Sequence, residues 1–188
     1  KVYKAILQEV RQRGTATKRD LSTHLQIKLT TLNRFLDDLI AEGWIRESGR
    51  EPSHRGRRPV LYECNPEAGY FVGIDISRTY LQTVLTDFQQ NILDQHHIPL
   101  AEPPSYEEIF RLIRERICLS LERHHLPKER LLGIGIGAVG PLDRRNGLLR
   151  KRRETMGAGW DEAPIVQWME EEFQTFVLLE NGANAAAW

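Results

Sequence analysis

The start of the chain carries three apolar stripes at helical spacing. In KVYKAILQEVRQRG, apolar residues recur every four positions from Val2 to Val10, and the segment stops at Gly14. TATKRDLSTHL has leucines four apart, and Thr17 is its predicted N-cap. LTTLNRFLDDLIAEG has the widest stripe and ends at Gly43. The pattern predicts three short amphipathic helices, of which the third covers residues 29–42.

Two strand-like runs follow the third predicted helix. WIRE and VLYEC flank the basic turn SGREPSHRGRRP, so we expect them to pair as a hairpin with arginines at its tip. Three helices followed by such a hairpin are the order of a winged helix-turn-helix. The sequence therefore predicts this domain over residues 1–66.

The candidate DNA contacts are the polar residues at the start of the third helix and the arginines of the wing. A recognition helix enters the major groove with its N-terminal residues against base edges, and an arginine-rich wing reaches phosphates or a narrow minor groove. The alternative is a solvated helix face and an ordinary charged hairpin, which either feature alone would favour. Their joint order favours DNA binding through Thr30, Thr31, Asn33, Arg34, Arg55, Arg57 and Arg58.

Residues 67–188 show strand-like runs that later alternate with helical ones. YFVGIDIS, YLQTVLTDF and NILDQHHIPL predict three successive strands. A long helix with a capping box at Ser105 and Glu108 follows, then a glycine-dotted strand, a short helix, the strand TFVLLE and the start of a last helix. The order βββαβαβα predicts an α/β fold, in which a mixed sheet is covered on its faces. This is the topology of one lobe of the actin-like, ribonuclease-H-like phosphotransferases.

The net charge of zero divides unevenly between the two predicted domains. Residues 1–66 hold 13 Lys and Arg against 8 Asp and Glu, and the remainder holds 13 against 18, so the two parts carry +5 and −5. A basic N-terminal part favours an anionic partner, and nucleic acid is the leading one. No apolar run approaches the roughly 18 residues of a membrane span, and no signal peptide is recognisable. We expect no membrane contact and a location in the reducing cytoplasm.

Metal and cofactor sites are not predicted. Cys64 and Cys118 lie far apart without zinc-ligand spacing. The histidine pairs at 96–97 and 124–125 make no chelate by themselves, because adjacent side chains diverge on a strand and on a helix. The basic cluster DRRNGLLRKRRE favours a solvated loop, since its neighbours are acidic overall.

Glycines dot the segment GIGIGAVGP, but they alternate along a strand and do not lead directly into a helix. A dinucleotide-binding motif is therefore a poor match. We expect Gly133 and Gly135 to allow close packing of a helix, and Gly137 and Gly140 to shape a loop on the ligand side.

Several motifs together resemble the ROK family of repressors, open reading frames and sugar kinases. GIDIS, GIGIGAVGPLD…NG, GWDEAPIVQWMEEEF and FVLLENGANAAAW follow the family's order at about its spacing, over nearly the whole chain. The leading winged helix, with TLNR in the third helix and RGRRP in the wing, is similar to the repressor branch, because kinase members lack it. The resemblance implies a DNA-binding repressor of sugar-metabolism genes that binds a double-stranded, roughly palindromic operator as a homodimer.

The family resemblance also implies a sugar-site corner in the second domain. Asn181 matches a sugar-contacting asparagine, Asn184 completes the pattern, and Gly137 is expected on the sugar side. Kinase members carry N-D-A-N here, with the aspartate as general base, whereas this chain has Gly182. Without that carboxylate, general-base help of roughly 10²–10⁴-fold is missing.

A phosphate-loop remnant is the second feature that the resemblance implies. Asp75, which follows a buried strand where a carboxylate can hold a magnesium–phosphate group, matches the family pattern D-x-G-x-T, as does Thr79. Ser77 replaces the glycine that would let backbone amides approach phosphate. We expect a domain that senses a sugar or sugar phosphate and is not an enzyme.

Family members continue into a second lobe that supplies further sugar contacts, with an E-x-G-H segment and a Cys-rich zinc cluster. The sequence contains no counterpart, so it predicts either a natural truncation or a fragment, and a sugar effector is expected where a second lobe is present. Two alternatives stay open. One is a ROK sugar kinase that phosphorylates hexoses with ATP, and the other is a truncated protein acting only through dimer formation.

Overall fold

The computed structural model describes residues 1–50, 58–101, 104–149 and 162–182. The chain divides into two compact units, Lys1–Ala68 and Gly69–Trp188. The division falls two residues after the boundary expected from the sequence. Each unit is described by itself.

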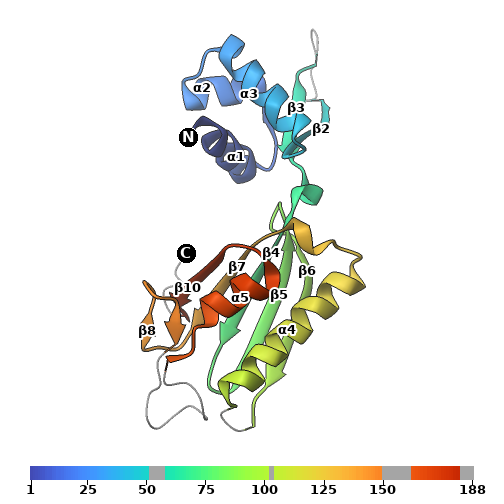
Figure 1. Ribbon diagram of the computed structural model, residues 1–188. Coiled ribbons are helices and arrows are strands. Elements are labelled where there is room, and N and C mark those ends of the chain that lie inside the picture. The colour runs from blue at the N-terminus through green and yellow to red at the C-terminus, as the bar shows by residue number, and fades with distance from the viewer. Residues whose placement is uncertain (51–57, 102–103, 150–161, 183–188) are drawn as a thin grey trace. The chain divides into compact units, whose positions relative to one another are not determined.

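The N-terminal unit consists of three helices and a small antiparallel sheet (Figure 1). Its helices are α1 (Val2–Arg13), α2 (Lys18–Leu25) and α3 (Leu29–Ala41), and its strands are β1 (Ala16–Thr17), β2 (Ile45–Arg50) and β3 (Val60–Cys64). The strand order is β1-β3-β2, and β2 and β3 form the predicted hairpin. The winged helix-turn-helix is confirmed.

Apolar stripes of the three helices form the core of this unit. Their fully buried members are Ile6, Val10, Leu21, Leu32 and Leu36. The predicted cap of α2 is present, because the Thr17 side chain accepts a hydrogen bond from the Asp20 N–H while the Asp20 carboxylate accepts one from Thr17. The two-residue strand β1, which pairs with Tyr62 and Leu61 of β3, was missed because two residues carry no periodic pattern.

The second unit is built on a five-stranded mixed sheet of order β10-β7-β4-β5-β6. Its strands are β4 (Tyr70–Ile76), β5 (Tyr80–Asp87), β6 (Ile92–Pro99), β7 (Leu131–Ala138) and β10 (Val177–Asn181). The main helices are α4 (Tyr106–Arg123) and α5 (Ile165–Phe173). β4, β7 and β10 run parallel, while β5 and β6 are antiparallel to their neighbours. The predicted α/β lobe is confirmed, together with the capping box at the start of α4.

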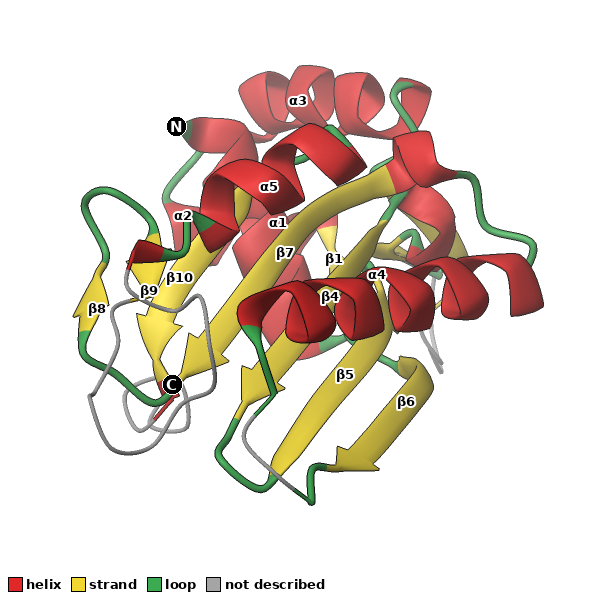
Figure 2. Cartoon of the chain, turned by 60° about the horizontal axis from the view of Figure 1, so that its bottom comes forward, coloured by secondary structure: helices red, strands yellow, loops and turns green. Residues whose placement is uncertain are grey.

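Both helices lie on the same side of this sheet (Figure 2). The core between them unites the buried face of the strands with the apolar stripes of α4 and α5, including Ile74, Ile134, Ile113 and Met169. Among the described residues α4 and α5 cover one face, and the helix predicted after the last strand lies largely outside the described residues, so covering of the other face stays a prediction. Sheets with parallel strands are usually covered on both faces.

Helix packing was predicted for Gly133 and Gly135, and no described helix lies against either glycine. A Cβ at Gly135 would meet nothing within 4 Å, and one at Gly133 would meet the Phe71 ring and the Phe176 carbonyl rather than a helix. Side chains alternate along a strand, so these glycines lie on the face opposite the buried Ile134 and Ile136.

A small hairpin, β8 (Leu142–Asp143) and β9 (Leu148–Leu149), was not predicted. The Asp143 carboxylate accepts hydrogen bonds from the backbone N–H and side-chain amide of Asn146, and Gly147 has a φ of 67°. The turn is therefore closed by local polar contacts. No described helix meets the length and hydropathy of a membrane-crossing segment.

Candidate DNA interface and remnant sugar site

The first half of α3 presents polar and basic side chains to solvent. Thr30, Thr31 and Arg34 are exposed, while Leu32 and Leu36 anchor the opposite side in the core. These three residues, predicted as DNA contacts, therefore share an accessible stripe near the start of the helix. Sequence pattern alone indicates this division, because it follows from the 3.6-residue turn.

Charge changes sign along the same stripe of α3. Lys28, the exposed N-cap, and Arg34 stand in its first half, whereas Asp37 and Glu42 are exposed in its second half. Lys28 makes no side-chain cap, so the first N–H groups of α3 have no side-chain partner at that position. Helix N-termini and basic residues attract phosphate, and the acidic half repels it. The charge distribution therefore favours contact with phosphate groups through the N-terminal half of α3 only.

Asn33 is less exposed than the other α3 residues that were predicted to contact DNA. It is half-buried, and its Oδ1 is a buried atom without a hydrogen-bond partner among the described residues. In this rotamer the carbonyl oxygen cannot reach a base edge. Thr30, Thr31 and Arg34 are the accessible members of the predicted set, and a role for Asn33 stays a prediction.

The wing is described only at its base. Arg58 is exposed just before β3, and Arg50 is exposed at the end of β2, but Arg55 and Arg57 lie outside the described residues. Arg46 of β2 pairs with Glu63 of β3 at 2.7 Å. Lys28 and Arg19 are two further exposed basic residues that the sequence analysis did not include among the candidate DNA contacts. Their positions at the starts of α3 and α2 could have indicated them.

Three parallel strands bring the remnant sugar and phosphate residues to one edge of the second unit. Gly137 of β7 is in register with Asp75 of β4 on one side and Glu180 of β10 on the other, and Asn181 follows Glu180. A Cβ at Gly182 would lie 3.7 Å from an Asp75 carboxylate oxygen. The position that carries the general base in the kinase pattern therefore adjoins the phosphate-loop aspartate. Asn184 lies outside the described residues.

A pocket of about 750 Å³ opens beside this edge on the face of the sheet without helices. Its lining combines the glycines Gly73, Gly135, Gly137 and Gly182 with larger apolar residues such as Val84 and Leu178 and with the acidic residues Asp75 and Glu180. Gly140 stands in the following turn, where an added Cβ would come within 3.0 Å of the Leu142 nitrogen. A side chain there would crowd the turn, and a role of Gly140 in shaping a loop on the ligand side stays a prediction.

The Asp75 carboxylate already has an internal partner. Tyr80 donates a hydrogen bond from its hydroxyl to Asp75 Oδ2 at 2.8 Å, and its ring stacks on His97 with centroids 5.0 Å apart. The hydrogen bond and the negative charge of Asp75 raise the pKa of the Tyr80 phenol. The turn is closed by the Ser77 N–H, which donates to the Tyr80 carbonyl at 2.9 Å, and by the Thr79 carbonyl, which accepts from Leu100. Sequence reasoning missed Tyr80.

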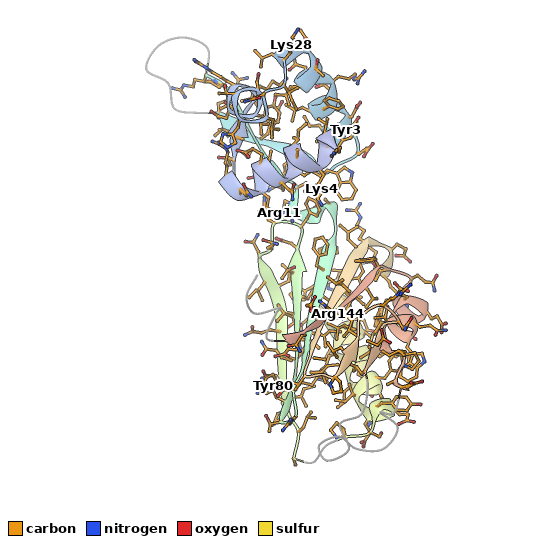
Figure 3. All side chains as sticks on the ribbon, turned by 90° about the vertical axis from the view of Figure 1, so that its left-hand side faces the viewer. Tyr3, Lys4, Arg11, Lys28, Tyr80 and Arg144 are labelled. Atoms are coloured by element: carbon orange, nitrogen blue, oxygen red, sulfur yellow. The ribbon has the colours of Figure 1, made fainter. Side chains whose placement is uncertain are left out.

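Arg144 engages the second carboxylate of the pocket. One of its guanidinium nitrogens lies 3.0 and 2.9 Å from the two oxygens of Glu180, and the same carboxylate accepts from the Asn181 N–H at 2.8 Å. Figure 3 shows Arg144 and Tyr80 on this unit. The basic cluster was predicted as a solvated loop, and Arg144 is largely exposed, yet it also forms an ion pair with Glu180.

Histidines from the two predicted pairs meet at another carboxylate. Asp94 of β6 lies 3.4 Å from His96 and 3.9 Å from His124, and Arg123 approaches it at 3.3 Å. Burial opposes ionisation of Asp94, but the Ser120 hydroxyl and the charges of His96 and Arg123 outweigh it and lower the pKa of the carboxyl. Among the described residues, no group of three His, Cys, Asp or Glu side chains could hold a metal ion.

Comparison with known proteins assigns both parts of the chain. The ROK family profile matches residues 71–188, and a winged helix-turn-helix DNA-binding profile matches residues 4–46. The chain belongs to the ROK family. The family resemblance seen in the sequence is therefore confirmed.

Relatives of this ROK protein include repressors and kinases. The xylose repressor of Caldicellulosiruptor bescii is 26% identical over 182 residues, which cover 97% of this chain and 45% of that protein. A solved ROK family transcriptional regulator, titled a homologue of the E. coli MLC protein, matches 99% of this chain and 45% of its own, with a TM-score of 0.68 at 19% identity. The ROK hexokinase of Thermus thermophilus matches 63% of this chain and 36% of its own, with a TM-score of 0.53 at 29% identity. The chain spans just under half the length of the repressors it matches.

Proposed function

We propose that this ROK protein is a DNA-binding transcriptional repressor of sugar-metabolism genes. The observation that carries the proposal is the union, in one chain, of a winged helix-turn-helix and a ROK domain. Similarity to a xylose repressor extends across 97% of the chain, including the unit that the kinase-type match does not cover. Its place of action is then the compartment that holds the operator, the cytoplasm.

The N-terminal half of α3 is proposed to contact base edges in the major groove. Thr30, Thr31 and Arg34 are exposed there, and arginine and threonine both have suitable donors. The wing arginines Arg55, Arg57 and Arg58 are proposed to contact phosphate. Two copies would bind half-sites about one helical turn apart, because a symmetric operator matches a two-fold protein.

Sugar sensing is proposed for the corner formed by Gly137, Asn181 and Asn184, completed by a second lobe. Xylose is the first sugar to test, since it is named for the similar repressor. The domain is proposed to be non-catalytic, because Gly182 has no base and Tyr80 occupies Asp75. A ligand that prefers one arrangement of the protein shifts its DNA affinity by that difference.

Selection of duplexes from a random pool, followed by fluorescence anisotropy across a salt series, tests the proposal. We expect a selected sequence to bind more tightly than shuffled DNA, with affinity that falls steeply as salt rises. Arg58→Ala should weaken binding to both DNAs, whereas Arg111→Ala, an exposed arginine of α4, serves as the matched control and should change neither. Absence of any selected duplex, or affinity indifferent to salt, would overturn the proposal.

A sugar kinase is the second candidate, supported by the similarity of 63% of the chain to a ROK hexokinase and by the Asp75 carboxylate at the end of β4. It requires ADP release that depends on a hexose and disappears in Asp75→Ala. We expect no such turnover, because the general base is absent and the phosphate turn carries Ser77.

A further inference from the structure

Arg34 stands beside two acids that should neutralise it. Asp37 and Asp38 follow it by three and four residues on α3, and these are the spacings at which acid–base pairs form on a helix. An arginine paired with its own helix is less available to DNA, because the pair must first be broken. Its availability therefore needs an explanation.

Arg34 makes neither of these pairs. Among the described residues it belongs to no ion pair. Instead Asp38 Oδ2 accepts a hydrogen bond at 2.7 Å from the hydroxyl of Tyr3, which lies on α1. That hydrogen bond raises the pKa of the Tyr3 phenol, while the positive charge of Arg34 acts in the opposite direction. The tyrosine thus engages the acid that is best placed to pair with Arg34.

A second contact lies between the guanidinium and an aromatic ring. The Arg34 guanidinium carbon lies 5.2 Å from the centre of the Phe35 ring, and the Phe35 ring meets Tyr3 edge-on with centroids 4.9 Å apart. Stacking uses the flat face of a guanidinium and leaves its N–H groups free in the plane. Figure 3 shows Tyr3 and Lys28 on the N-terminal unit.

We infer that Tyr3 is a positioning residue for DNA reading, which keeps Arg34 available by occupying Asp38 while Phe35 supports the guanidinium face. The inference rests on the proposed DNA-binding function. It extends the reading surface to α1, a helix that none of the predicted contacts includes. Tyr3 acts through Asp38 and Arg34 and needs no contact with DNA.

A purely structural role is the competing explanation, in which Tyr3 only ties α1 to α3. The two roles differ in how Tyr3→Phe, which removes one hydroxyl and keeps the ring, depends on Asp38. If the hydroxyl restrains Asp38, its loss matters only while an acid occupies position 38. If it only ties the helices, its loss costs about the same when Asp38→Asn is already in place.

Anisotropy titrations of the selected duplex at low salt provide the first test, with Tyr3→Phe made in three backgrounds. In the wild-type background we expect an affinity loss of about twofold, the cost of breaking an exposed i,i+4 pair. In Asp38→Asn the same change should have no effect, although Asp38→Asn itself tightens all DNA binding by removing a negative charge. In Asp37→Asn, the matched control, the twofold loss should persist. Equal effects of Tyr3→Phe in the wild-type and Asp38→Asn backgrounds would overturn the inference.

Nitrogen-15 NMR of the Arg34 Nε–Hε group provides a readout without DNA. Tyr3→Phe should shift this resonance, as the guanidinium pairs with the released carboxylate, and Tyr3→Phe with Asp38→Asn should return it. An Arg34 Nε–Hε chemical shift that does not change in Tyr3→Phe would overturn this inference and leave the proposed function standing. Failure of the wild-type chain to bind any duplex would instead overturn the proposed function, so the two failures are distinguishable.

Discussion

The two units treat their polar groups in opposite ways. On α3, Thr30 and Thr31 are exposed, Arg34 has no ion-pair partner among the described residues, and Tyr3 donates a hydrogen bond to the nearby Asp38. At the sheet edge of the ROK domain, Tyr80 holds Asp75 and Arg144 holds Glu180. Free donors suit recognition of an external partner, whereas satisfied carboxylates stabilise their own domain.

This difference indicates which unit has polar groups available for an external partner. The sheet edge still gathers Asp75, Gly137 and Asn181, but the Asp75 carboxylate carries an internal hydrogen bond. The helix-turn-helix has its polar residues on an open stripe instead. The following experiments separate the two units, from the largest expected effect to the smallest.

Removing a core side chain should affect one unit only. Leu36 is fully buried in α3, so Leu36→Ala should lower the free energy of unfolding of the N-terminal unit by about 2–5 kcal/mol. Ile113→Ala, equally buried in α4, should do the same to the second unit. Differential scanning calorimetry of both variants checks whether each lowers a separate transition. A single transition lowered equally by both would show that the units unfold together.

Arg34→Ala should relax sequence discrimination. A base contact by arginine contributes roughly 1–3 kcal/mol of discrimination, so the affinity ratio of selected to shuffled duplex should fall about tenfold or more. Competition anisotropy measures this ratio. Arg58→Ala, predicted to lose a phosphate contact, should leave the ratio unchanged while it weakens both affinities. An Arg34→Ala ratio equal to that of wild type would remove Arg34 from the reading surface.

Tyr80→Phe tests the opposite side of the comparison. The change removes the donor to Asp75 and keeps the ring on His97, so the second unit should lose about 0.5–1.5 kcal/mol of unfolding free energy. DNA affinity should stay as in wild type. Chemical denaturation and anisotropy on the same sample give both values, and a gain in stability would mean that the Asp75 hydrogen bond is not stabilising.

Acid should act on the second unit through Asp94. The pKa of Asp94 is lowered in the folded state, so its ionised form contributes stability above the ordinary value of about 3.9. That contribution is lost as pH falls through the lowered pKa. Asp94→Asn should therefore flatten the decline of the melting temperature below about pH 4. The corresponding change in the free energy of unfolding should be about 1 kcal/mol or less. An unchanged acid profile in Asp94→Asn would assign the decline to other carboxylates.

Periodicity predicted most elements of both units. The helices of the N-terminal unit, the N-cap Thr17 and the capping box at Ser105 followed from local spacing, since such features depend on residues a few positions apart. The predicted element order βββαβαβα followed in the same way, and its last helix lies largely outside the described residues. The hairpin β8–β9 and strand β1 were missed, because two-residue strands are decided by their partners. Alternation along the strands identified the two faces of the sheet, but it does not determine what covers each face.

The candidate site residues also divide into those that the sequence predicted and those whose contacts depend on packing. The residue types at Asp75, Ser77 and Gly182, read against the family pattern, were sufficient to predict a phosphate turn and a missing base. Pairing between Tyr3 and Asp38, or between Arg144 and Glu180, joins residues more than thirty positions apart. Such contacts depend on how helices and strands pack.

Local spacing thus determined which residues form most of the helices and longer strands, because hydrogen-bonded turns and alternating side chains are short-range properties of the chain. Tertiary structure alone decided which charged groups stay free and which are satisfied. Arg34 is left available and Asp75 is engaged because packing places one tyrosine beside Asp38 and another beside Asp75.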